Sequence, residues 1–140
     1  MMEEKRKIRL CIVSRMRDDL GDMHETKSAH RGWLVKTAHG AILEYDEEQD
    51  GERANIMLSI ENAHAEMLRK GMTSARLVFE PGKRTSSAYV TMYGEIPVAV
   101  DTRRVVMLGD ETGGRLMLDY AVFVGGEKTS DALLEITWRA

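Results

Sequence analysis

The sequence predicts an all-β fold, an antiparallel barrel of about eight strands, from three observations. Apolar residues recur at every second position along most of the 140 residues, and residues two apart lie on one face of a strand. Turn-forming pairs such as Asp50-Gly51, Pro81-Gly82 and Gly125-Gly126 separate these runs. Eight strands of about eight to ten residues use most of this length, and closing such a sheet into a barrel removes its exposed edges.

Alternating apolar residues mark six strands, and two further strands lie on either side of His39-Gly40. Each alternating set describes one buried strand face. The sets are Ile8, Leu10 and Ile12; Ile56, Leu58 and Ile60; Ala75, Leu77 and Phe79; Ile96, Val98 and Val100; Leu116, Leu118, Tyr120, Val122 and Val124; and Ala132, Leu134, Ile136 and Trp138. Gly109-Asp110 and Gly113-Gly114 are expected to bracket a loop.

The segment Glu61 to Lys70 allows two interpretations. It contains good helix formers, and Ala63, Met67 and Lys70 stand three to four residues apart, as on one face of a helix. A short helix is therefore one alternative. We expect a strand instead, because a hairpin or a short crossing has to join the neighbouring strands.

Composition limits the class of protein. One domain covering residues 1–140 is expected, since this length is typical of a single globular domain. A single cysteine excludes a disulfide framework and suits the reducing cytoplasm, and no apolar run approaches the roughly 20 residues that cross a bilayer. The net charge of −3 argues against a nucleic-acid module. We expect a cytoplasmic protein that binds neither nucleic acid nor a membrane.

Two stretches resemble a known family. Arg31 to Glu47 reads RGWLVKTAHGAILEYDE, and Met67 to Thr102 contains the run YVTMYG. The chain is similar to the bacterial YwiB-like proteins, a family of unknown function with a calycin-like (lipocalin-type) β-barrel. The residues that carry the resemblance are Gly32, Gly40, Tyr45, Glu47, Arg69, Gly71, Phe79, Gly82, Tyr89, Thr91, Tyr93, Gly94 and Thr102. Met92 stands where the family usually has proline.

A ligand site is expected in the barrel. Tyr89, Thr91 and Tyr93 are two residues apart, so their hydroxyl groups should project from one strand face. Phenols on an interior face would offer a small ligand apolar area and hydrogen bonds, and Arg76 or Arg104 could pair with an anionic group on it. Structural roles for the three hydroxyl residues, and a solvated face for the arginines, are the alternatives. No cofactor is expected.

Two other functions stay open. Met57, Met107 and Met117, with Phe123 and Leu133, have the parity opposite to the apolar sets, and together they could form the patch of a homodimer with a packed, ligand-free barrel.

An enzyme would need a polar cleft, for which Asp22, His24 and Glu25 are the only candidates. We expect neither catalysis nor a bound metal. The stretch Asp46 to Gly51 starts like a calcium loop, but Met57 stands where such a loop needs glutamate.

Overall fold

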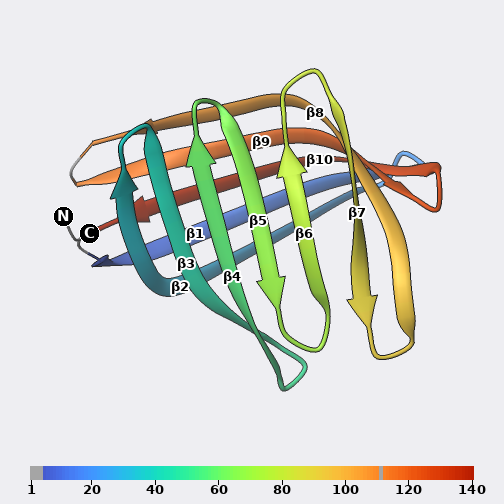
Figure 1. Ribbon diagram of the computed structural model, residues 1–140, viewed down its shortest axis with the longest axis horizontal. Helices are drawn as coiled ribbons and strands as arrows, with labels where there is room; N and C mark the ends of the chain where they lie inside the picture. The colour runs from blue at the N-terminus through green and yellow to red at the C-terminus, as the bar shows by residue number, and fades with distance from the viewer. Residues whose placement is uncertain (1–4, 111) are drawn as a thin grey trace.

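The computed structural model describes residues 5–110 and 112–140, and within them it consists of ten strands and no helix (Figure 1). The strands are β1 (Lys5–Asp18), β2 (Met23–Thr37), β3 (Gly40–Gln49), β4 (Glu52–Glu61), β5 (His64–Lys70), β6 (Ser74–Phe79), β7 (Arg84–Thr91), β8 (Gly94–Gly109), β9 (Gly113–Val124) and β10 (Glu127–Arg139). That part of the chain accordingly offers no helix that could span a membrane.

The ten strands form one closed antiparallel barrel. Each strand pairs with its neighbours in the sequence, and β1 pairs with β10 from Arg9↔Arg139 to Asp18↔Ser130. The predicted antiparallel barrel is confirmed, with ten strands rather than about eight. The estimate was low because β5 and β6 have only seven and six residues, fewer than the length assumed for each strand.

The turns explain why the segment after Glu61 is a strand. Asn62 and Ala63 have φ angles of 49° and 63°, which resemble the 54° and 79° of Asp50-Gly51 in the predicted β3–β4 hairpin. Positive φ at both central residues is the geometry of a two-residue hairpin turn. The expected strand is therefore confirmed as β5, and the helical alternative is wrong.

The predicted apolar sets fill the barrel. Leu43, Leu58, Phe79 and Ile136 have no exposed surface, and most of the predicted sets belong to the same cluster. Ile96 and Val124 are exposed, with 44% and 38% of their surface accessible, and Ala75 and Ala132 also lie outside the cluster. Alternation thus predicted which face of most strands is buried.

A β-bulge changes the parity of β8. The β8–β9 register shifts between Thr102 and Arg104, so the residues that face inward after it are Val105 and Met107. The expectation that Met107 lies on the outer face is therefore wrong. Phe123 does face outward, but the guanidinium of Arg84 covers its ring at 4.0 Å from the centroid. The methionine and phenylalanine set consequently forms no single exposed patch.

The barrel opens towards one end. β3 pairs with β2 only from Gly32 to Thr37, while Met23 to Arg31 continue along β1 alone. β6 and β7 share only two register pairs, Ser74↔Val90 and Ala75↔Tyr89. The tips of the β3–β4, β5–β6 and β7–β8 hairpins lie on this side, at the bottom of Figure 1. We call it the open end.

Candidate functional site

One row of paired residues crosses the interior near the open end. Tyr45 pairs with Ile56, Ile56 with Arg69, Arg69 with Ala75, and Ala75 with Tyr89. Directly opposed residues in a sheet point to the same face. Tyr45 and Ile56 are buried in the core, so Arg69 and Tyr89 face the interior with them.

An ion pair lies next to this row. Nη1 of Arg69 donates a hydrogen bond to Oε2 of Glu47, and both side chains are about one-third exposed or less. Glu47 is two residues beyond Tyr45 on the same face of β3. On the other side of Tyr45, the ring of His30 lies 4.9 Å away, centroid to centroid. We call Tyr45, Glu47, Arg69 and Tyr89 the open-end cluster.

Two further polar residues extend the open-end cluster inward. Tyr120 packs edge-on against Phe79, with ring centroids 4.9 Å apart, and pairs with Thr102 across β8 and β9. Thr102 is 2% exposed, and its Oγ1 atom has no hydrogen-bond partner among the described residues. A buried hydroxyl without a partner is costly, and this oxygen atom is also closed to solvent.

The phenols near the cluster are held in the neutral form. Burial raises the pKa of the Tyr45 phenol; the Glu47 charge adds to this shift, and the Arg69 charge opposes it. Burial also raises the pKa of Tyr89, with Arg69 opposing and Glu47 adding. Burial and the neighbouring Tyr89 raise the pKa of Tyr120 to about 12. All three groups therefore carry their proton at neutral pH and can donate a hydrogen bond.

These phenols have no hydrogen bond to any described residue. None of the three phenol oxygens is among the fully buried polar atoms without a partner, so each of them reaches solvent. A hollow of about 210 Å³ lies beside Arg69, between the β3–β4 and β5–β6 turns, and includes Arg53, Ala54 and Thr73 in its lining. The barrel centre, by contrast, is filled by side chains such as Leu58 and Phe79. Of the open-end cluster only Arg69 lines this hollow, and the three phenols do not.

The structure places the three predicted hydroxyl residues differently. Tyr89 faces the interior. Thr91 Oγ1 instead closes the β7–β8 turn, since it donates to the carbonyl of Gly94 at 2.9 Å and accepts from the amide of Tyr93 at 3.1 Å. Tyr93 lies in that turn and is 93% exposed. The prediction that all three share one strand face is wrong for Tyr93, because β7 ends at Thr91.

The two predicted arginines lie on the outer face. Arg76 faces away from the core, as its parity predicts, and binds both carboxylate oxygens of Glu66 at 2.8 and 3.1 Å. Arg104 lies 3.6 Å from Asp119. Neither joins Tyr89; Arg69 is the arginine of the interior. The strand expected over 61–70 gives Arg69 the parity of Ala65 and Met67, so the sequence did contain a signal that Arg69 faces inward.

The residues considered for an enzyme have structural partners. His24 Nε2 lies 3.0 Å from the Asp18 carboxylate, and Glu25 forms ion pairs with Arg15 and Lys27. Asp22 donates its backbone amide to Asp18. Within residues 5–110 and 112–140, no three His, Cys, Asp or Glu side chains are placed to hold a metal ion.

Comparison with known proteins gives the family. A family model described as a domain of unknown function, DUF1934, matches residues 11–136. The chain belongs to this family. The DUF1934 match covers all ten strands at least in part, and together with the similarity to YwiB it confirms the predicted membership.

Relatives of this DUF1934 chain have the same fold. The uncharacterized beta-barrel protein YwiB of Bacillus subtilis is 23% identical over 137 residues, which cover 98% of this chain and 96% of YwiB. A crystal structure of the ywiB protein from Bacillus subtilis matches with a TM-score of 0.89 at 22% identity, over 99% of this chain and 94% of the other. At this identity the likeness shows the fold alone.

Four of the thirteen residues that carry the family resemblance meet in space. Tyr45, Glu47, Arg69 and Tyr89 come from β3, β5 and β7, and the DUF1934 barrel brings them together as the open-end cluster. The sequence could not show this meeting, because it depends on the register of four strand pairs.

Proposed function

We propose that this chain is a binding protein and not an enzyme, and that it takes up a small, partly apolar ligand at the open end of its barrel. The observation that carries this proposal is the set of interior phenols of Tyr45, Tyr89 and Tyr120, which are protonated and lack protein partners. Small-ligand sites combine mostly apolar walls with a few such polar groups.

The neighbours of the phenols favour a ligand of low charge. Ile56 and Ala75 stand in the same row as Tyr89 and would contact the apolar part of the ligand. Glu47 already neutralises Arg69, so an anionic group would gain the guanidinium only by displacing that carboxylate. Hydroxyl or carbonyl groups would bind the phenols without this cost. The ligand class we propose is therefore a small aromatic or aliphatic molecule with hydroxyl or carbonyl groups.

The hollow beside Arg69 is smaller than the about 300–1,000 Å³ of most drug-sized sites. A larger ligand would need the barrel to widen. The place where widening costs least is the boundary between β6 and β7, which has two register pairs and lies next to Tyr89.

Amide chemical-shift mapping of the folded chain by NMR tests the proposal, with phenol and 4-hydroxybenzoate as the probes. We expect phenol to shift the amides of the open-end cluster. Tyr89→Phe should weaken binding by about fivefold, the effect of one lost hydrogen bond. Tyr93→Phe is the matched control and should bind as the unmodified chain does, because Tyr93 lies outside the cluster.

Stronger binding of 4-hydroxybenzoate than of phenol would show that Arg69 is available to anions. That result would refute the low-charge ligand class, but the proposed location of the ligand site would still hold. An absence of shifts in the cluster at millimolar phenol and 4-hydroxybenzoate would refute the site itself. Sedimentation of the same samples measures the homodimer alternative.

A further inference from the structure

Three arginines form a row on the outer face of the barrel, away from the open-end cluster. Arg9 on β1 is the direct cross-strand partner of Arg31 on β2 and of Arg139 on β10. All three are exposed, and the neighbours Leu10 and Trp138 point inward. Side chains directly opposed in an antiparallel sheet have Cβ atoms about 4.5–5.5 Å apart. The row therefore places three positive charges side by side.

No carboxylate of the described residues forms an ion pair with Arg9, Arg31 or Arg139. Elsewhere on the outside, ion pairs between arginine and carboxylate are common; examples are Arg15 with Glu25 and Arg84 with Asp101. Like charges directly opposite destabilise a sheet. The three arginines repel one another, and no carboxylate neutralises them. We infer that a bound anion neutralises this charge.

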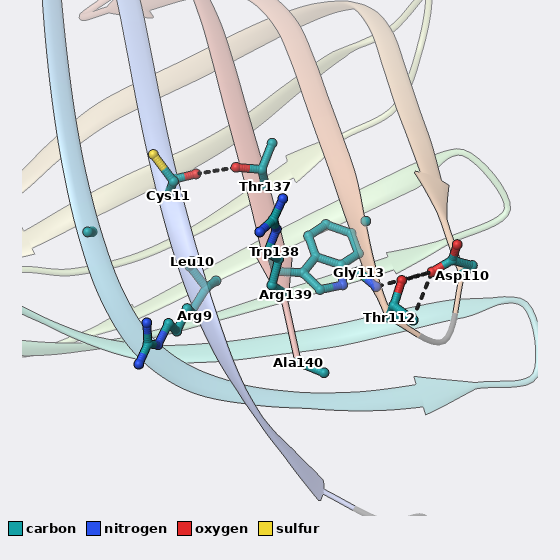
Figure 2. Close-up of a pocket in the computed structure, with 12 residues that line it drawn as sticks. Arg9, Leu10, Cys11, Asp110, Thr112, Gly113, Thr137, Trp138, Arg139 and Ala140 are labelled. Atoms are coloured by element: carbon teal, nitrogen blue, oxygen red, sulfur yellow. Dashed lines mark hydrogen bonds between the residues drawn. The ribbon is translucent and has the colours of Figure 1, made fainter.

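Two hollows lie against the row. The larger has a volume of about 950 Å³ and is lined by Arg9, Cys11 and Arg139, with Asp110 on its opposite wall (Figure 2). Asp110 Oδ1 accepts hydrogen bonds from Thr112 and Gly113, so its own turn already uses that oxygen. The smaller hollow has a volume of about 440 Å³ and shares Arg9 with the first.

The smaller hollow adds an aromatic ring and a fourth cation. Arg31, Lys7 and Trp33 line it. Trp33 is 38% exposed, and the Lys7 ammonium lies 5.9 Å from its ring centroid. An exposed indole beside several cations suits a ligand that has both phosphates and a flat ring.

We propose that the arginine row binds a small molecule with two or more linked phosphates. Guanidinium groups bind phosphate oxygens with paired, charge-assisted hydrogen bonds. Three such groups in a row exceed the charge of one phosphate, so a chain of phosphates matches them better. The linked phosphates could be those of an inorganic oligophosphate or of a nucleotide, and Trp33 would distinguish the two sources.

Cys11 provides a local reporter of binding. It is the only cysteine of the chain, it is exposed, and it lines the larger hollow. N-ethylmaleimide is uncharged and does not compete for the arginines. We expect inorganic triphosphate at low ionic strength to slow the alkylation of Cys11 several-fold, and sodium chloride of equal ionic strength to leave it unchanged.

Arg9→Gln should abolish this protection and weaken triphosphate binding, measured by calorimetry, about tenfold or more. Arg17→Gln is the matched control: it removes the same charge from the outer face of the same strand, about 26 Å away along β1, and should bind normally. Thermal unfolding checks that Arg9→Gln folds. Its midpoint at low salt should rise, because the repulsion on both neighbours is removed.

A second arm identifies the source of the phosphates. If adenosine triphosphate binds more tightly than inorganic triphosphate, and Trp33→Leu removes this difference in affinity, the ligand is a nucleotide. Equal affinities would assign the oligophosphate group alone. The proposal is overturned if triphosphate gives no protection at millimolar concentration, or if Arg17→Gln loses as much binding as Arg9→Gln. Tyr89→Phe at the open end should not change any of these results.

Discussion

Trp138 fills one end of the barrel because its cross-strand partner on β9 has no side chain. Gly114 on β9 is its cross-strand partner, and a Cβ atom built there would lie 2.2 Å from Cζ2 of the indole. The ring is 4% exposed, so it has no free side to move into. Gly114 is needed here for space, since nothing in its backbone angles requires glycine.

Gly114→Ala should therefore destabilise the barrel by about 1–3 kcal/mol, the usual cost of overpacking a core. Urea unfolding followed by circular dichroism measures the change. In a Trp138→Leu background the same substitution should cost less, because the clashing ring atoms are gone and only the Leu108 carbonyl oxygen, 2.8 Å from the added Cβ, remains. Equal costs in the two backgrounds would show that the indole is not the reason for the glycine.

Some residue roles were readable in the sequence and others were not. Alternation predicted the buried position of Leu58 and Ile136, because parity is a local property. Gly109-Asp110 and Gly113-Gly114 bracket the β8–β9 connection, as expected, since β8 ends at Gly109 and β9 begins at Gly113. The pair itself does not show that Gly114 also leaves space for an indole. Trp138, the side chain that needs this space, is 24 residues away in the sequence.

At the scale of elements, the boundary between β6 and β7 is unlike the others. Beyond the two register pairs, side chains on β7 form hydrogen bonds to the backbone of β6. The hydroxyl of Thr85 donates to the carbonyl of Val78, and the hydroxyl of Ser87 donates to the carbonyl of Arg76. Fewer backbone pairs hold these two strands than hold any other neighbours in the described barrel. This boundary is where the barrel should open first.

Removing one of these hydroxyls should loosen the boundary. We expect Ser87→Ala to lower the free energy of unfolding by about 1 kcal/mol, and to speed hydrogen exchange in β6 and β7 more than in β1 or β10. Ser86→Ala is the control, because Ser86 is exposed on the same strand and makes no hydrogen bond to the described residues. Equal exchange in both variants would contradict the role given to Ser87.

The strands themselves could be predicted, whereas their irregularities could not. Period two identified the core strands, and turn pairs such as Asp50-Gly51 identified hairpins. The bulge after Thr102 reversed the parity of Met107, and the early end of β7 moved Tyr93 into a turn. Both depend on how neighbouring strands align. The open-end cluster escaped prediction for the same reason.

At the scale of the whole molecule, the buried phenols link folding to alkaline pH. Burial raises the pKa of Tyr120 from 10.0 to about 12, and the pKa values of Tyr45 and Tyr89 move in the same direction. A raised pKa means that the folded state holds the proton more tightly than the unfolded state does. The resulting stabilisation is complete below pH 10 and is lost as the pH rises towards 12.

The free energy of unfolding in urea should fall by about 2–3 kcal/mol for Tyr120 alone between pH 9 and pH 12. Tyr120→Phe should show a shallower fall over the same range, because its ring cannot ionise. The two pH series are compared after each is referred to its own value at pH 8. Identical slopes would show that the phenol of Tyr120 does not control alkaline unfolding.

Closure by β1 and β10 sets an order in time when the chain is made. Ile12 and Ile136 pair directly although 124 residues separate them. At about 5–20 residues per second, a ribosome needs roughly 6–25 seconds to add those residues. During that interval β1 can pair with β2, but the edge of β1 that pairs with β10 has no partner. The charged side chains of Arg9, Arg15 and Arg17 along β1 then discourage its joining to the strands of neighbouring nascent chains.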